Sequence, residues 1–104
     1  MTEFKHISVA ETAEKIAADA VTICDIRDPD SFAAGHIANA FHLSDQSMVK
    51  LLNEVDFSRP VVVVCYHGHS SQGAAEYLAQ QGFEEVYSMD GGFVKWAQEQ
   101  PSVS

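Results

Sequence analysis

A run of four valines at residues 61–64 stops at Cys65. After the cysteine come the short polar stretch YHGHSS and then QGAAEYLAQQG, which is rich in helix-forming residues. Four consecutive β-branched residues predict a buried strand, and Gly82 is suited to end a helix in the left-handed conformation. The pattern therefore predicts a strand over 61–64, a tight loop and a helix over 70–81, with Cys65 at the carboxyl end of the strand.

The rest of the chain shows the same alternation of short strands and helices. We expect further strands at residues 4–7, 21–25, 40–43 and 86–88. We expect helices from the Ser8–Glu11 capping box to about 18, over 30–34, from a Ser44 cap to about 53, and from 91–92 to before Pro101. Strands that are apolar throughout, alternating with helices, are typical of a parallel sheet covered on both faces. The prediction is one α/β domain over residues 1–104, with a central, mostly parallel sheet of about five strands.

The charge balance argues against some classes of partner. Fifteen acidic and six basic residues give a formal net charge of −9, which repels nucleic-acid backbones and anionic lipid. The sequence shows no apolar run of membrane-spanning length and no secretory signal at its start. We therefore expect a cytoplasmic protein without nucleic-acid or membrane partners, in which the two cysteines do not form a disulfide.

The loop after Cys65 can hold a negative charge on sulfur. A tight turn into a helix directs free backbone N–H groups toward the strand end, Gly68 permits an unusual backbone conformation, and Ser70 or Ser71 can cap the helix. An ordinary thiol has a pKa of about 8.5. The helix terminus contributes roughly 0.3–1 kcal/mol, and each charge-assisted hydrogen bond roughly 1.5–3 kcal/mol. We expect Cys65 to be a thiolate at neutral pH.

Two classes of enzyme use a thiolate in such a loop. One class comprises the cysteine phosphatases and arsenate reductases, and the other comprises the enzymes that transfer sulfur. Cysteine phosphatases clamp the phosphoryl oxygens with an arginine six positions after the cysteine. That position here is Ser71, and residues 66–71 contain neither arginine nor lysine. A persulfide anion needs only the amides of the loop. The loop therefore favours sulfur transfer over phosphoryl transfer.

Four segments together resemble the single-domain rhodaneses, the small bacterial thiosulfate sulfurtransferases. They are CDIRDP at 24–29, FAAGHIANA at 32–40, the Cys65 loop, and DGGFVKW at 90–96. The chain departs from the family pattern in having Ala38-Asn39 where Pro-Gly is usual and Lys95 where glutamate is common. The loop also lacks the cation that many thiosulfate-binding members carry.

The resemblance implies a rhodanese-like fold and a double displacement at Cys65. The thiolate would take the sulfane sulfur of thiosulfate, release sulfite, and pass the persulfide sulfur to cyanide or to a dithiol such as thioredoxin, with no metal or organic cofactor. The implied substrate-binding residues are those of the loop: Tyr66, His67, Gly68, His69, Ser70 and Ser71. A noncatalytic rhodanese-like module that binds a partner remains an alternative.

Other residues receive more ordinary interpretations. Cys24 lies within a β-branched run and is expected in the core. His67 and His69 could tune the thiolate, help hold an anion or face solvent, and a metal site built from them with Cys65 is disfavoured. Asp25 and Arg27 could contact the substrate, but we favour the interpretation that they form an ion pair that orders the loops. The remaining expectations are a structural hydrogen bond from His36, no catalytic role for His6 and His42, core positions for Phe93 and Trp96, and Tyr66 at the pocket mouth.

Overall fold

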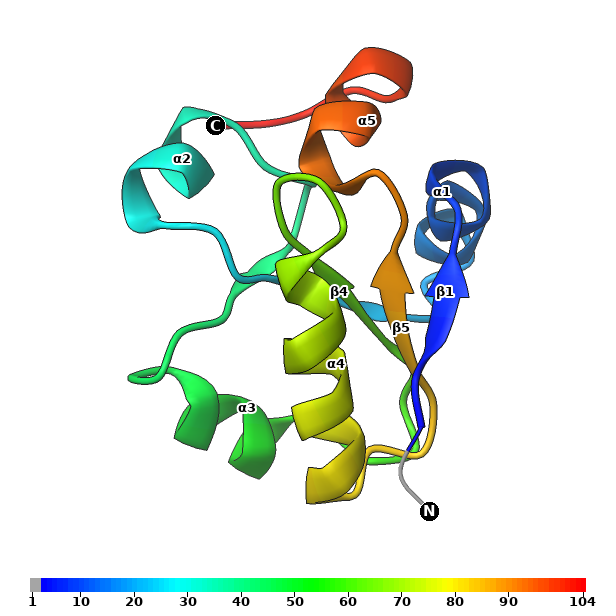
Figure 1. The fold of residues 1–104 in the computed structure, drawn as a ribbon, viewed down its shortest axis with the longest axis vertical. Helices are drawn as coiled ribbons and strands as arrows, with labels where there is room; N and C mark the ends of the chain where they lie inside the picture. Colours follow the sequence, from blue (N-terminus) through cyan, green and yellow to red (C-terminus); the bar gives the residue numbers. More distant parts are fainter. Residues whose placement is uncertain (1–2) are drawn as a thin grey trace.

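The computed structural model describes residues 3–104, in which strands and helices alternate along the chain (Figure 1). The strands are β1 (Lys5–Ile7), β2 (Thr22–Asp25), β3 (Phe41–His42), β4 (Val61–Val64) and β5 (Val86–Met89). The helices are α1 (Val9–Ala17), α2 (Pro29–Ala34), α3 (Met48–Glu54), α4 (Ser70–Gln81) and α5 (Gly92–Glu99). Strand β4 and helix α4 have the predicted bounds, and the other strands differ from prediction by one residue at one or both ends.

All five strands form one sheet in the order β1-β5-β4-β2-β3, and each neighbouring pair is parallel. The predicted parallel sheet of about five strands is confirmed. Strand β4 is central, with β5 on one side and β2 on the other. The chain leaves β2 toward β3 and leaves β4 in the opposite direction toward β5, so the connections reverse between β2 and β4. In open parallel sheets, ligands bind beyond the carboxyl ends of the strands at such a reversal. Cys65 directly follows β4 and lies at this position.

The valines of β4 divide the core into two clusters. Val61 and Val63 pack in a cluster with residues of α3 and α4, whereas Val62 and Val64 pack in a second cluster with residues of α1 and α5. All four valines are completely buried, because alternate side chains of a central strand point to opposite faces. The expected helices on both faces are therefore confirmed.

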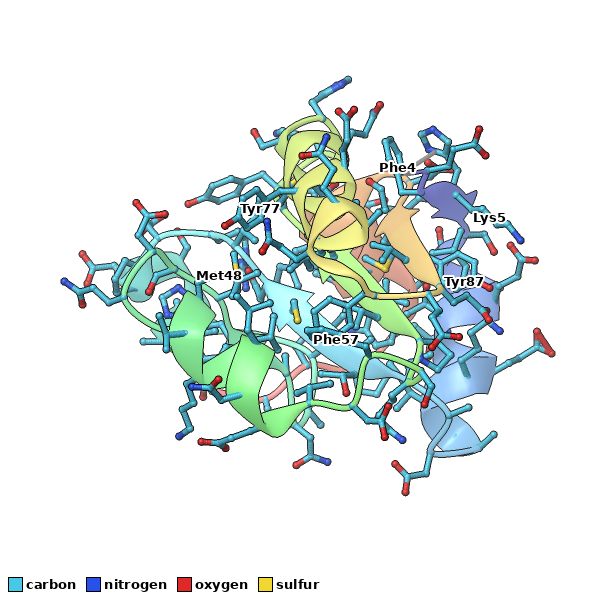
Figure 2. All side chains as sticks on the ribbon, turned by 90° about the horizontal axis from the view of Figure 1, so that it is seen from below. Phe4, Lys5, Met48, Phe57, Tyr77 and Tyr87 are labelled. Atoms are coloured by element: carbon cyan, nitrogen blue, oxygen red, sulfur yellow. The ribbon has the colours of Figure 1, made fainter. Side chains whose placement is uncertain are left out.

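The α3–α4 face carries a shallow apolar groove. Met48 of α3 and Tyr77 of α4 line it, and both are labelled in the view from below (Figure 2). Among the helices of residues 3–104, none has the length and apolar character needed to cross a membrane.

Local sequence signals explain several of the helix ends, and the start of α3 requires a correction. Ser8 and Glu11 form the predicted capping box, and Gly82 ends α4 in the left-handed region at φ 117°. Helix α3 begins at Met48, so the expected cap at Ser44 is wrong. The Ser47 hydroxyl accepts a bond from the Ser44 amide at 2.8 Å and donates to the His42 carbonyl at 2.9 Å. These bonds stabilise a turn over 44–47, and the helix starts only after it.

Candidate active site

Hydrogen-bond donors of the loop converge on the sulfur of Cys65. The Gly68 amide donates to Sγ at 3.1 Å and the Ser71 amide donates at 3.2 Å. The Ser71 hydroxyl oxygen also lies 3.2 Å from Sγ. The chain produces this arrangement because the loop turns back at Gly68, whose φ of 92° suits glycine, and Ser71 stands in the first turn of α4.

These donors stabilise the thiolate of Cys65. Burial raises the pKa of the thiol, since only 4% of the residue is exposed. Hydrogen bonds from the Ser71 hydroxyl and from the amides of Ser71, Gly68 and His67 act in the opposite direction, and the pKa of Cys65 is lowered overall. Cys24 is the contrasting case, because burial and the nearby Asp25 charge raise its pKa to about 12. Cys24 is completely buried, which confirms its core position.

We expect the two thiols to differ sharply in their pH dependence. Iodoacetamide reacts with thiolates, so the alkylation rate of Cys65 should reach its plateau at a lower pH than that of a free cysteine. Cys24 should remain unlabelled in the folded protein and become labelled in urea. Peptide mass spectrometry after timed labelling measures both rates. A Cys65 profile centred at or above about pH 8.5 would contradict the thiolate assignment.

The other predicted loop residues lie on the outer side of the loop. His67, His69 and Ser70 are exposed, and the Tyr66 side chain points toward α2. His69 is the N-cap of α4 and makes no side-chain capping bond, so the expected cap at Ser70 or Ser71 is wrong. The Ser71 side chain instead faces Cys65 and Ser88. Within residues 3–104, no three side chains of the types His, Cys, Asp and Glu are grouped as a metal site would require.

Helix α5 holds the loop from the other side. The Phe93 amide donates to the Cys65 carbonyl at 2.7 Å, and the Val94 amide donates to the Tyr66 carbonyl at 3.1 Å. These are free amides at the start of a helix. Gly92 permits the close approach: its φ is 61°, and a Cβ there would lie 2.3 Å from the Tyr66 carbonyl oxygen. The Asp90-Gly91-Gly92 segment thus allows a helix terminus to support the carbonyl side of the Cys65 loop.

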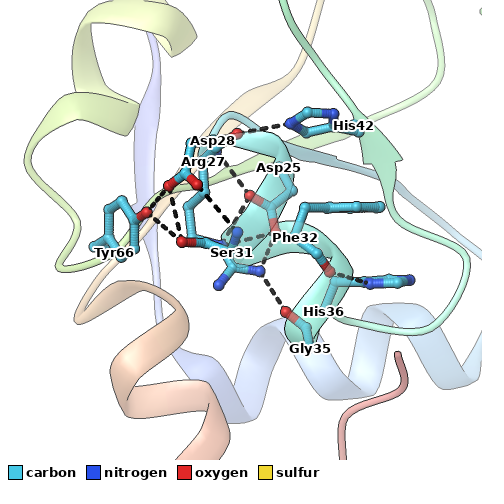
Figure 3. A network of polar contacts seen from close by, with 9 residues as sticks. All are labelled: Asp25, Arg27, Asp28, Ser31, Phe32, Gly35, His36, His42 and Tyr66. Carbon is cyan, nitrogen blue, oxygen red and sulfur yellow. Dashed lines mark hydrogen bonds and ion pairs between the residues drawn. The ribbon is translucent and has the colours of Figure 1, made fainter.

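A buried ion pair connects β2 with α2 (Figure 3). Arg27 Nη2 lies 2.8 Å from Asp25 Oδ2 and donates to the Gly35 carbonyl at 2.6 Å. The guanidinium carbon lies 3.9 Å from the centre of the Phe93 ring. Asp25 is 1% exposed and Arg27 6% exposed, and the predicted ion pair is confirmed. Its bonds anchor the segment before α2 and bring the Phe93 end of α5 against it.

Tyr66 extends this network to the Cys65 loop. Its hydroxyl donates to Asp28, the N-cap of α2, and lies 2.6 Å from the Ser31 hydroxyl (Figure 3). The bond from Tyr66, followed by those from Ser31, lowers the pKa of Asp28 to about 2. The pairing of Tyr66 with Asp28 is not predictable from the sequence, because nothing in either segment indicates that they meet.

The histidines near this network have structural contacts. His36 Nδ1 donates to the Phe32 carbonyl at 2.7 Å, which confirms the expected structural bond, and its ring stacks on Phe32. His42 Nε2 donates to the Arg27 carbonyl at 2.6 Å. His6 forms an exposed pair with Asp90 at 2.8 Å. None of these three contacts involves Cys65.

Comparison with known proteins identifies the family of the chain. The family model described as "Rhodanese-like domain" matches residues 8–99. The chain belongs to the rhodanese-like domain family. The family resemblance predicted from the four sequence segments is therefore confirmed, and the fold is rhodanese-like.

Individual rhodanese relatives cover nearly the whole chain. A curated thiosulfate sulfurtransferase GlpE from Pseudoalteromonas translucida is 55% identical over 93 residues, which is 89% of each chain. A rhodanese-related protein from Thermoplasma volcanium has a TM-score of 0.81 at 29% identity and covers 96% of this chain and 98% of its own. A rhodanese-like domain protein from Staphylococcus aureus has a TM-score of 0.78 at 28% identity, covering 89% and 91% respectively.

Proposed function

We propose that this chain is a thiosulfate sulfurtransferase in which Cys65 is the nucleophile. The observation that carries the proposal is the convergence of two backbone amides and one hydroxyl on Sγ of Cys65. A sulfur atom surrounded by donors is stabilised as an anion both before and after it accepts a second sulfur. The 55% identical thiosulfate sulfurtransferase supports the choice of donor.

The proposed reaction is a double displacement, in which the sulfur passes first to Cys65 and then to an acceptor. The Cys65 thiolate attacks the outer sulfur of thiosulfate; a new S–S bond forms, the old one breaks, and sulfite leaves with the electron pair. Cyanide then attacks the outer sulfur of the Cys65 persulfide, forms thiocyanate and restores the thiolate. A dithiol such as thioredoxin would accept the sulfur in the same way. No metal or organic cofactor enters either step.

The loop would assist both displacements through fixed dipoles. The amides of Gly68 and Ser71 offset negative charge at the sulfur without having to reorganise, since α5 and α4 hold the loop on both sides. Thiosulfate is a dianion and the chain has a net charge of −9, so the donor has to be attracted by these local dipoles. The exposed imidazoles of His67 and His69 stand on the same loop, where an entering anion can meet them.

The cellular setting forms part of the proposal. Two free thiols, Cys24 and Cys65, suit a reducing compartment, so we place the enzyme in the cytoplasm. The acidic surface is unfavourable for nucleic acid and for anionic membranes as partners. Its partners would accordingly be a small sulfur donor and a thiophilic acceptor.

The decisive experiment is to look for one added sulfur on Cys65. The protein is incubated with thiosulfate, and its intact mass and its Cys65 peptide are measured by mass spectrometry. We expect a gain of one sulfur atom on Cys65, which disappears when cyanide is added while thiocyanate forms. A noncatalytic partner-binding module would gain no sulfur.

An assay with an aryl phosphate tests the phosphatase alternative on the same sample. The place of the phosphate-clamping arginine is held by Ser71, whose side chain faces Cys65 and Ser88. We therefore expect no phosphate release. Release of phosphate without any sulfur uptake would replace the proposed function with phosphoryl transfer.

A further inference from the structure

Ser88 places a hydroxyl in the buried interface between β5 and α4. It is completely buried, as is Met89, and Val86 of the same strand is 2% exposed. A buried hydroxyl without a partner is costly. The side-chain partner of Ser88 is Ser71 of α4, at an Oγ–Oγ distance of 2.7 Å, and Ser71 is also completely buried.

The two serines and Cys65 form a row of three polar atoms. Ser88 Oγ contacts Ser71 Oγ, and Ser71 Oγ contacts Cys65 Sγ at 3.2 Å. When Cys65 is a thiolate, Ser88 donates to Ser71 and Ser71 donates to the sulfur, so both protons have acceptors. When Cys65 is a thiol, the row holds three protons for two contacts, and one proton has no acceptor within the row. Within this row, every proton therefore has an acceptor only when Cys65 is a thiolate.

We propose that Ser88 is a positioning residue that directs the Ser71 hydroxyl proton toward Cys65 and so helps to keep the sulfur ionised. Donation from Ser88 occupies the Ser71 oxygen, and the Ser71 proton is then free to point at the sulfur. It also polarises the Ser71 hydroxyl and strengthens it as a donor. The inference rests on the proposed function in taking Cys65 as the reacting thiol.

Substitutions in the serine pair leave every charge around the site in place. The charged and titratable groups on the elements packed around Cys65 and the serine pair are Cys24, Asp25, Arg27 and Asp28 around β2, Tyr66, His67 and His69 in the loop, Glu76 and Tyr77 on α4, Tyr87 and Asp90 at β5, His6 on β1, and Lys95 and Glu99 on α5. The serine hydroxyl does not ionise over the pH range in which a cysteine thiol titrates. A change in Cys65 reactivity in serine variants therefore reports on hydrogen bonding.

The test is a double-mutant cycle on the pH profile of Cys65 alkylation by iodoacetamide. Ser71→Ala should raise the Cys65 pKa by roughly one unit or more, because it removes a hydrogen bond to a charged group. Ser88→Ala should raise the pKa by roughly half a unit, because the Ser71 hydroxyl loses its polarising donor. In the Ser71→Ala background, Ser88→Ala should cause no further shift, since Ser88 acts through Ser71.

A control variant and a stability measurement separate this role from a structural one. Gly73→Ala adds a methyl group at an exposed position of the same helix, where a Cβ would meet nothing within 4 Å, and should leave the Cys65 pKa unchanged. The double variant removes both hydroxyls together and leaves neither unpaired. At a pH low enough to protonate Cys65 in every variant, it should therefore unfold at nearly the same urea concentration as the wild type. The Cys65 pKa should change while stability at this low pH does not.

Three results would overturn the proposal. They are an unchanged Cys65 pKa in Ser88→Ala, equal shifts from Ser88→Ala with and without Ser71, and a pKa change that follows a loss of stability at the low pH where Cys65 is protonated in every variant. Alkylation requires no sulfur donor, so this experiment is independent of the proposed transferase activity. If the protein took up no sulfur from thiosulfate but the alkylation profiles were as expected, the proposed transferase activity would be rejected. The role of Ser88 would be retained.

Discussion

Cys65→Ser is expected to abolish sulfur transfer from thiosulfate to cyanide, with a rate loss of roughly 10³-fold or more. A serine hydroxyl stays protonated at neutral pH and cannot form a persulfide. The oxygen can still accept hydrogen bonds from the Gly68 and Ser71 amides, so the loop retains its partners. Thiocyanate formation measures the rate, and a thermal unfolding curve close to that of the wild type checks the fold.

Cys24→Ala is the matched control, because it removes the second thiol of the chain. Cys24 is completely buried in the core, so this variant should lose some stability while its transfer rate stays within about twofold of the wild type. Retention of more than a few percent of the activity in Cys65→Ser would mean that another group accepts the sulfur. The assignment of Cys65 would then be wrong.

The second large effect is expected from Gly92→Ala. The new Cβ would lie 2.3 Å from the Tyr66 carbonyl oxygen and 2.6 Å from that of Cys65, at a φ of 61°. Left-handed strain and the clash together predict a loss of roughly 3 kcal/mol or more in the free energy of unfolding. The loop carbonyls would also separate from the Phe93 and Val94 amides. Urea denaturation measures the stability, and thiocyanate formation should fall with it.

Gly73→Ala makes the same chemical change at a site where the opposite result is expected. Gly73 is exposed within α4, and a Cβ there would meet nothing within 4 Å. Replacing glycine by alanine in a helix interior should raise the free energy of unfolding by roughly 0.5–1 kcal/mol. If Gly92→Ala proved as stable as Gly73→Ala, the close approach of α5 to the Cys65 loop would be contradicted.

The local sequence pattern predicts the helices and strands of this chain better than it predicts how they pack together. The strand at 61–64 and the helix at 70–81 have sharp composition changes at both ends, and their bounds needed no correction. The start of α3 was misplaced because Ser44 resembles a helix cap while the bonds of Ser47 favour a turn. The pairing of β1 with β5 joins strands at opposite ends of the chain, and no local signal in either segment specifies it.

The site shows the same division between local and distant contacts. Cys65, Gly68 and Ser71 lie within seven consecutive residues, so a tight turn is sufficient to predict that amides face the sulfur. The support from Phe93 and the contact of Ser71 with Ser88 arise only when β5 and α5 pack beside β4 and α4. One feature of the sequence could have indicated the role of Ser88: it is a lone small polar residue in the otherwise apolar strand VYSM.

The contact between α5 and the Cys65 loop has a consequence for protein synthesis. Cys65 leaves the ribosome before Phe93 and Val94, whose amides hold the carbonyls of Cys65 and Tyr66. Until the last helix docks, the nascent polypeptide lacks this support, and its cysteine should behave like that of an unstructured peptide. The cysteine would then gain its nucleophilic character only once α5 has packed against the Cys65 loop.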